Sequence, residues 1–163
     1  MKSAFNVLFL CTHNSARSLM AEAIAAKHAG SDFNIYSAGT APYVEPDAEA
    51  IAKLQSFGFD TSNLTPKFWT TFTDHSAPKM NFVISLDDTL DDAPAKFFVD
   101  AVRATWPLPD TSDLHGKPAE RAALLNEIFA RLQRAIGAFM ALPLRSLDEM
   151  VVKAKMDALA VEG

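Results

Sequence analysis

The chain has only one cysteine, Cys11, among its 163 residues. A single cysteine excludes an intramolecular disulfide and gives no basis for a zinc site built from thiolates, so the composition indicates a reducing, cytoplasmic environment. Any redox chemistry at Cys11 therefore needs a second thiol from another molecule.

An excess of basic residues is also absent, because 15 Lys and Arg stand against 20 Asp and Glu and give a formal net charge of −5. A protein that binds nucleic acid uses Lys and Arg to neutralise phosphates, so we expect no nucleic-acid partner. The sequence has no run of about 18 apolar residues, and its N-terminal apolar stretch, residues 5–10, is too short to cross a bilayer. We therefore expect no membrane span.

Glycine and proline are scarce, with six and nine residues, and hydrophobic side chains make up 49% of the chain. This composition excludes a disordered, low-complexity or collagen-like protein. The length suits one domain around one hydrophobic core, so we predict a single domain over residues 1–163.

Apolar stretches of strand length alternate with helical patterns along the chain. Residues 5–10 form a short continuous apolar run, as in a strand covered on both faces of a parallel sheet. Helical spacing over residues 17–29, ended by Gly30, predicts the helix that follows. By the same criteria we predict strands at 33–38, 81–86 and 101–105, a helix at 46–57 and a short helix at 66–73. The alternation predicts an α/β fold with a small parallel sheet, in which ligands bind at the carboxyl ends of the strands.

Two helical patterns follow in the C-terminal third. Apolar residues at three- and four-residue spacing over 118–141 predict a long amphipathic helix that covers one face of the sheet. Residues 146–159 form a further helical pattern, with Ser146 as N-cap and Glu149 completing a capping box. This last helix either packs on the core or forms a dimer contact, and the sequence leaves both open.

The loop after the first predicted strand joins a cysteine to the Arg-Ser pair that begins a helix. Its residues are Cys11, Thr12, His13, Asn14, Ser15, Ala16, Arg17 and Ser18. Successive backbone N–H groups and the amides at a helix N-terminus can surround a tetrahedral oxyanion such as phosphate or arsenate. The planar guanidinium of Arg17 can bind two oxygens of the same anion. We therefore predict an oxyanion-binding loop that extends from Thr12 to Arg17.

Cys11 is the candidate nucleophile of this loop. The positive field of the loop favours the thiolate form, which is the nucleophilic form of cysteine, and the Ser18 hydroxyl can donate a hydrogen bond to the sulfur. A lone cysteine after an apolar strand is otherwise a small buried hydrophobe. The arginine six residues on, the serine seven residues on and the strand-loop-helix context together favour catalysis.

These residues, followed by Met20-Ala21-Glu22, resemble the low-molecular-weight tyrosine phosphatase superfamily and, within it, the thiol-coupled arsenate reductases. The segments 36–40, 58–62 and 106–110 are similar to that family in order and spacing, so the resemblance covers residues 5–140. It implies a three-layer α/β fold, with a four-stranded parallel sheet flanked by helices, to which a C-terminal helical extension over about 144–160 is added.

The resemblance also implies a general acid in a late loop, which protonates the leaving oxygen. Asp110, four residues after Trp106, matches this position, and Asp113 is a nearby alternative. Thr111 stands where the family usually has a proline. Because that proline stiffens the loop, its replacement puts the rigidity of the acid loop in question.

The residues that could bind a metal do not have the pattern of a metal site. Some arsenate reductases of this family bind potassium, and Asn14, Glu22 and Ser37 match three of their ligands, but a cation, Lys67, stands at the fourth. The histidines show no metal-ligand spacing; they are His13, His28, His75 and His115. We interpret Asp87, Asp88, Asp91 and Asp92 as a solvated acidic loop, or a docking edge for a basic partner.

Two activities share the attack of Cys11 on an oxyanion. In an arsenate reductase, an external thiol such as glutathione or mycothiol then releases arsenite, assisted by a glutaredoxin-type partner; in a tyrosine phosphatase, water hydrolyses a phosphocysteine. Thioredoxin-coupled reductases carry two more cysteines after the third strand, whereas residues 85–94 have none. Since Trp106 is the only aromatic expected beside Asp110 and the loop is closer to the reductase version, we favour an arsenate reductase without a tightly bound cofactor. A non-catalytic oxyanion-binding or partner-binding relative is the third alternative.

Overall fold

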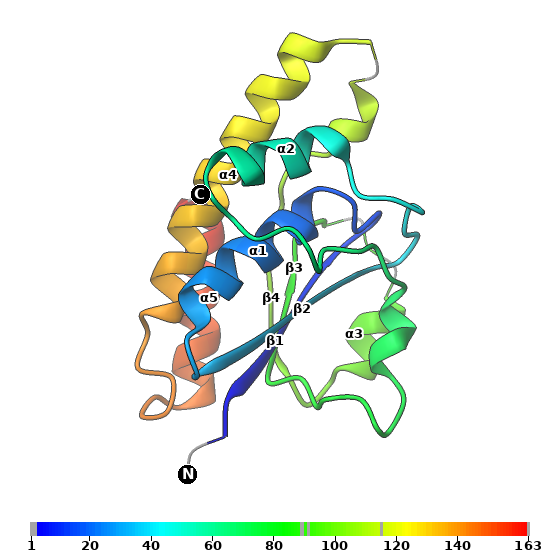
Figure 1. The fold of residues 1–163 in the computed structure, drawn as a ribbon. Coiled ribbons are helices and arrows are strands. Elements are labelled where there is room, and N and C mark those ends of the chain that lie inside the picture. Colours follow the sequence, from blue (N-terminus) through cyan, green and yellow to red (C-terminus); the bar gives the residue numbers. More distant parts are fainter. Residues whose placement is uncertain (1–2, 89, 91, 115, 163) are drawn as a thin grey trace.

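The structure is a computed structural model that describes residues 3–88, 90, 92–114 and 116–162. Its four strands are all parallel and lie in the order β2-β1-β3-β4, as Figure 1 shows. They are β1 (Phe5–Cys11), β2 (Phe33–Gly39), β3 (Phe82–Ser85) and β4 (Val102–Thr105). The predicted four-stranded parallel sheet is confirmed, and the loop after β1 lies at the carboxyl edge of a central strand.

One face of the sheet carries the larger core. The helices packed there are α1 (Arg17–Ala29), α2 (Ala48–Ser56), α4 (Pro118–Met140) and α5 (Glu149–Glu162). Buried side chains from the strands and these helices, among them Phe9, Ile24 and Ile128, form one continuous cluster. The N-terminal half of α4 extends past the sheet beside α2 (Figure 1, yellow). This arrangement places the N-termini of α1, α2 and α4 at the same end of the molecule.

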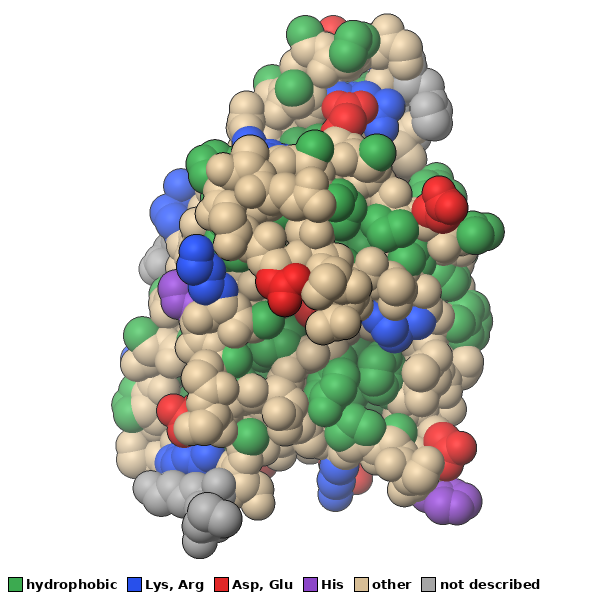
Figure 2. Space-filling model, in the orientation of Figure 1, with side chains coloured by type: hydrophobic (Ala, Val, Ile, Leu, Met, Phe, Trp, Pro, Cys, Tyr) green, Lys and Arg blue, Asp and Glu red, His purple; other side chains and the backbone are tan. Residues whose placement is uncertain are grey.

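The opposite face of the sheet has a smaller cover. It consists of the short helix α3 (Ala93–Phe97), which the sequence did not predict, and the 3-10 turn η1 (Trp69–Phe72), which is all that forms of the helix predicted at 66–73. Because these elements are short, Phe68, Phe97 and Val99 stay 42%, 48% and 61% exposed. Figure 2 shows patches of hydrophobic side chains on the half of its face that carries α3 and the neighbouring loops.

The C-terminal helix α5 packs on the core, which was one of the two predicted alternatives. Its Val152, Met156 and Leu159 are buried, and Trp106 Nε1 donates a hydrogen bond of 2.8 Å to the carbonyl of Met156. The predicted start of this helix is wrong. The helix begins at Glu149 behind Asp148, whose carboxylate accepts from Met150 N at 2.8 Å, so Asp148 caps it.

Ser146 does not cap α5 because its hydroxyl donates to the carbonyl of Pro143 at 3.0 Å and closes the preceding turn. The predicted capping box therefore does not form.

Among the residues that the structure describes, no helix has both the length and the apolar character of a bilayer-spanning segment.

The end of β2 supports the loop after β1 through a glycine. Gly39 pairs with Cys11 across the two strands, and a Cβ at Gly39 would lie 2.7 Å from the carbonyl oxygen of Thr12 and 3.0 Å from Cβ of Asn14. Neither neighbour can move without shifting the loop backbone. The absence of a side chain at Gly39 thus allows the loop to approach β2 closely.

Candidate active site

The predicted oxyanion loop lies between the end of β1 and the start of α1. Cys11, Asn14 and Ser18 are buried, and the side chain of Arg17 is only 4% exposed. One cleft is lined by the predicted site residues Cys11, His13, Ser15, Ala16, Arg17 and Asp110, together with Tyr43, Asp47, Thr111, Ser112 and Arg121. The structure therefore brings the predicted nucleophile, arginine and acid to one place.

The sulfur of Cys11 lies within hydrogen-bond distance of the Ser18 hydroxyl. Ser18 Oγ lies 2.9 Å from Cys11 Sγ, and Asn14 Nδ2 donates to the same Oγ at 2.6 Å. Since the amide of Asn14 occupies an acceptor position of Ser18, the hydroxyl proton of Ser18 is free to point at the sulfur. A hydrogen bond donated by Ser18 stabilises a thiolate at Cys11, which is the role that the sequence analysis expects of Ser18.

Asn14 holds the loop in an unusual conformation. It has a φ of 47°, in the left-handed region that side chains other than glycine rarely adopt. Its Oδ1 accepts from Lys67 N at 2.9 Å, and its Nδ2 donates to Ser37 Oγ at 3.0 Å as well as to Ser18. These bonds on both ends of the amide stabilise the strained turn.

The chain of hydrogen bonds continues to Glu22 on α1. Ser37 Oγ donates to Glu22 Oε1 at 2.5 Å. Burial raises the pKa of Glu22, while the Ser37 hydrogen bond and the positive charge of Lys67 oppose the increase. The network thus joins a half-buried carboxyl group to the Cys11 sulfur through three polar side chains.

These residues do not fit the potassium site that some arsenate reductases of the resembled family carry. Asn14 directs its NH₂ group, and not its oxygen, at Ser37, and Ser37 uses its hydroxyl proton on Glu22. A lysine, Lys67, supplies positive charge near the carboxyl group. Within the described residues, no group of three or more His, Cys, Asp or Glu side chains is placed to hold a metal ion.

Arg17 is held between two carboxylates. Its Nη1 lies 3.2 Å from Asp87 Oδ2 and donates to the carbonyl of Leu108 at 3.3 Å, and its Nη2 lies 3.4 Å from Asp110 Oδ2. Asp87 also accepts from Thr12 Oγ1 at 2.6 Å, and its side chain is only 11% exposed. The interpretation of Asp87 as part of a solvated loop is therefore wrong.

Asp87 is a site residue that the sequence analysis missed. It comes directly after β3, which pairs with β1, so its position at the carboxyl edge beside the loop follows from the strand order. The strand order was the signal that could have found Asp87, because residues that follow neighbouring parallel strands meet at one edge of the sheet.

The acid loop is fixed by Asp110 itself. Asp110 Oδ1 accepts from Ser112 N at 2.9 Å and so caps the 3-10 turn η2 (Thr111–Asp113). Thr111, which replaces the family proline, is buried at 5% exposure. Backbone capping and burial thus hold this loop without a proline. The side chain of the alternative acid, Asp113, lies outside what the structure describes, as do His115 and Asp91.

The aromatic side chain beside Asp110 is not the predicted one. Trp106 is buried against α5, as described above, and does not line the cleft. Tyr43 does line it and stacks on His13, with ring centroids 4.1 Å apart and planes 8° apart. The prediction that Trp106 lies beside Asp110 is wrong. Side chains of a strand and its extension alternate between the two faces of the sheet, and the sequence does not show which of these faces α5 covers.

The rim of the cleft is charged. Asp47 caps α2 by accepting from Ala50 N at 3.0 Å, and its own N–H donates to the carbonyl of Ser15 at 2.9 Å. Arg121, near the start of α4, lies 3.2 Å from Asp47 Oδ2 and 3.4 Å from Glu49 Oε1. A polar rim of this kind suits a small charged ligand better than a large apolar one.

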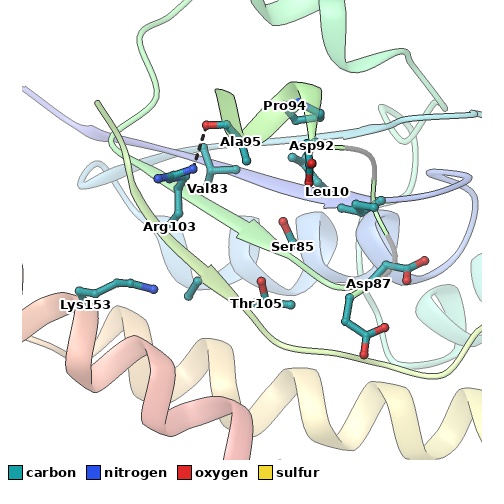
Figure 3. A pocket seen from close by; sticks show the side chains of 13 residues that line it. Leu10, Val83, Ser85, Asp87, Asp92, Pro94, Ala95, Arg103, Thr105 and Lys153 are labelled. Atoms are coloured by element: carbon teal, nitrogen blue, oxygen red, sulfur yellow. Dashed lines mark hydrogen bonds between the residues drawn. The ribbon is translucent and has the colours of Figure 1, made fainter. Parts of the chain in front are cut away.

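A second cavity of about 410 Å³ lies on the other side of Asp87 (Figure 3). Its lining includes the carboxylates of Asp87, Asp88 and Asp92 and the cations Arg103 and Lys153. In Figure 3, Arg103 and Lys153 lie on the side away from Asp87. Asp87 is the side chain that this cavity shares with the oxyanion loop.

Comparisons with known proteins agree with this geometry. A family model described as low molecular weight phosphotyrosine protein phosphatase matches residues 6–150. A curated arsenate reductase from Bacillus licheniformis is 33% identical over 133 residues, which are 80% of this chain and 88% of the relative.

Two solved structures are similar over most of this chain. An arsenate reductase in a phosphate-binding state has a TM-score of 0.63 and 26% identity, with 82% of this chain and 97% of that chain covered. A thioredoxin-dependent arsenate reductase from Corynebacterium glutamicum has a TM-score of 0.60 and 26% identity, with 83% of this chain but only 63% of that chain covered. With this fold, this loop and these matches, the chain belongs to the low molecular weight phosphotyrosine protein phosphatase family of enzymes.

Proposed function

We propose that this chain is an arsenate reductase that uses Cys11 and an external thiol. The observation that carries the proposal is the single cysteine, held by Ser18 at the base of an oxyanion loop that Arg17 and Asp110 complete. The curated relative at 33% identity is named an arsenate reductase, which supports the same choice.

In the first step the Cys11 thiolate attacks arsenic. The new Sγ–As bond replaces an As–O bond, and Asp110 gives its proton to the leaving oxygen, which departs as water. Arg17 exchanges its carboxylate contacts for two oxygens of the bound anion. Arsenic stays in the +5 state, so no electron pair has yet moved to it.

In the second step an external thiolate attacks Cys11 Sγ. A disulfide forms between Cys11 and that thiol, and the electron pair of the Sγ–As bond stays on arsenic, which leaves as arsenite. A glutaredoxin-type partner then reduces the mixed disulfide and restores Cys11. Low-molecular-weight thiols and such partners are cytoplasmic, which is where we propose that the chain acts.

Glutathione suits the cavity beside Asp87 better than mycothiol does. Glutathione carries an ammonium group and two carboxylates, whereas mycothiol is an uncharged sugar thiol. The cavity is lined by the carboxylates of Asp87, Asp88 and Asp92 and by the cations Arg103 and Lys153, and Figure 3 shows both cations on the side away from Asp87. Opposite charges in one cavity favour a zwitterionic peptide thiol. We therefore propose this cavity as the thiol subsite.

Binding of S-methylglutathione, which cannot react, tests the subsite by calorimetry. We expect binding to the native chain, and at least about fivefold weaker binding to Arg103→Met, because one charge pairing is lost. Equal binding by the variant, or no binding to either, would place the thiol elsewhere.

A tyrosine phosphatase is the second candidate, because the family model carries that name and the first step is the same. It needs water to attack the phosphocysteine where the reductase needs a thiol. A non-catalytic oxyanion-binding protein is the third candidate and predicts no turnover with either substrate.

The deciding experiment supplies arsenate, glutathione, glutaredoxin and glutathione reductase and follows NADPH, beside p-nitrophenyl phosphate, for the native chain and Cys11→Ser. We expect arsenate-dependent loss of NADPH that Cys11→Ser abolishes. Hydrolysis of the phosphate ester without arsenate reduction would instead identify a phosphatase. Inactivity with both substrates, together with no arsenite release in a second assay that supplies mycothiol in place of glutathione, would favour the binding protein.

A further inference from the structure

His13, in the oxyanion loop, has a defined tautomer. Its Nδ1 lies 3.1 Å from the carbonyl oxygen of Ala41. A carbonyl oxygen only accepts hydrogen bonds, so Nδ1 carries a proton. The stack on Tyr43 fixes the plane of the ring. Nε2 is therefore the one nitrogen of His13 that can gain or lose a proton while this contact persists.

Nε2 of His13 faces the carboxyl group of Asp110. It lies 3.7 Å from Oδ2, and the same Oδ2 lies 3.4 Å from Arg17 Nη2. The other oxygen, Oδ1, is engaged by Ser112 N. Oδ2 is thus the oxygen on which a transferable proton would sit, between the imidazole and the arginine that binds the oxyanion.

We propose that His13 is a positioning residue for Asp110, which orients Oδ2 and returns the proton that Asp110 gives to the leaving oxygen. The inference rests on the proposed function, in which Asp110 is the general acid. After Asp110 has lost its proton, the imidazolium form of His13 passes its Nε2 proton to Oδ2 through one water, because the 3.7 Å separation is too long for a direct hydrogen bond. His13 then becomes the neutral Nδ1–H form that Ala41 holds. Solvent then reprotonates Nε2, because 23% of the His13 side chain is exposed.

Five further charged groups lie near the pair. They are the guanidinium groups of Arg17 on α1 and Arg121 on α4 and the carboxyl groups of Asp47, Asp87 and Glu49. A change in pH profile after substitution of His13 alone therefore reports the loss of Nε2, since the other five groups stay in place.

His13→Asn tests the proposal because asparagine keeps an amide that can donate to Ala41 and lacks Nε2. We expect saturated turnover with arsenate to fall about 10-fold, with KM for arsenate changed less than about twofold. The pH at which turnover declines should shift downward, because Asp110 must then hold the proton alone. The control is His28→Asn, which makes the same change at an exposed histidine on α1 and should leave turnover and pH profile unchanged.

Asp110→Asn and the double variant separate this inference from the proposed function. We expect Asp110→Asn to slow turnover about 100-fold and the added His13→Asn to slow it no further. Full turnover in Asp110→Asn would show that the proposed acid is wrong. A slow Asp110→Asn with a fully active His13→Asn, or with losses that multiply, would show that His13 does not act through Asp110.

His13→Gln covers the case in which His13→Asn does not fold by circular dichroism. Its amide reaches toward Oδ2 and can orient the carboxyl group, but it cannot exchange a proton. We expect KM to stay near the native value and the pH profile to keep the downward shift. A native pH profile in His13→Gln would overturn the proton-returning role.

Discussion

The two sides of the oxyanion loop are built differently. On the inner side, Asn14, Ser18 and Ser37 are fully buried and joined by hydrogen bonds of 2.6–3.0 Å. On the outer side, His13 and Asp110 have side chains that are 23% and 31% exposed, and His13 Nε2 lies 3.7 Å from Asp110 Oδ2.

This difference separates two tasks of the site. The inner side orients the Cys11 sulfur before any anion arrives, and such preorganisation lowers the barrier to attack because no bond has to be rearranged. In the proposed mechanism the outer side exchanges protons with solvent in every turnover, which requires exposure. Arg17 shares features of both sides. Its side chain is buried, as on the inner side, and it pairs with Asp110 of the outer side as well as with Asp87.

The largest expected effect comes from removing the nucleophile that the inner side orients. Cys11→Ser should reduce arsenate turnover by at least about 1,000-fold, because a serine hydroxyl is not ionised in this loop and cannot take part in a disulfide. The variant should bind phosphate and unfold like the native chain. Steady-state kinetics measures the turnover, and thermal unfolding with and without phosphate measures the stability and the binding. Turnover near the native rate in the variant would show that Cys11 is not the nucleophile.

A methyl group under the loop should disturb the inner side next most strongly. Gly39→Ala forces the backbone of Thr12 and Asn14 to shift, so we expect about a 100-fold loss of turnover and a free energy of unfolding lower by about 1–3 kcal/mol. Gly137→Ala in α4 is the matched control, because a Cβ there meets no atom within 4 Å and alanine favours a helix. Equal behaviour of the two variants would contradict the close approach at Gly39.

Ser18→Ala removes a single bond from the inner side. The Cys11 thiolate loses its hydroxyl donor and Asn14 loses one acceptor, so we expect turnover to fall about 10-fold. The rate at which Cys11 reacts with iodoacetamide near neutral pH should fall with it, since the thiolate is less stabilised. An unchanged alkylation rate would remove Ser18 from the stabilisation of the sulfur.

The smallest effect concerns the far end of the inner network. Burial raises the pKa of Glu22 above its ordinary value of 4.5, so the folded chain keeps a proton that the unfolded chain releases. The free energy of unfolding should therefore fall as pH rises from about 4.5 through the raised pKa. Glu22→Gln cannot ionise and should lose this fall, which urea unfolding at several pH values measures. An identical pH dependence in the variant would exclude Glu22 as its source.

The nucleophile side of the site was largely predictable from the sequence. The positions of Cys11, Arg17 and Ser18 follow from local rules, in which a buried strand, a tight loop and a helix start leave few geometries. The same rules predicted α1, α4 and the order of the strands in the chain.

The features that were missed depend on contacts between distant segments. Asp87 reaches the loop because β3 pairs with β1, and Trp106 turns away from the cleft because α5 covers its face of the sheet. Local pattern does not determine either contact. The cap of α5 was misplaced for a related reason, since Ser146 and Asp148 are both good caps and only the preceding turn selects between them.

The most direct test of the account is a single turnover with limiting arsenate and glutathione, without glutaredoxin, followed by intact-protein mass spectrometry and measurement of arsenite. The account predicts one arsenite released for each protein that gains one glutathionyl group, with the group on Cys11. Arsenite release from a protein that carries no glutathionyl group, or a glutathionylated protein without arsenite, would contradict transfer of the electron pair from Cys11 sulfur to arsenic.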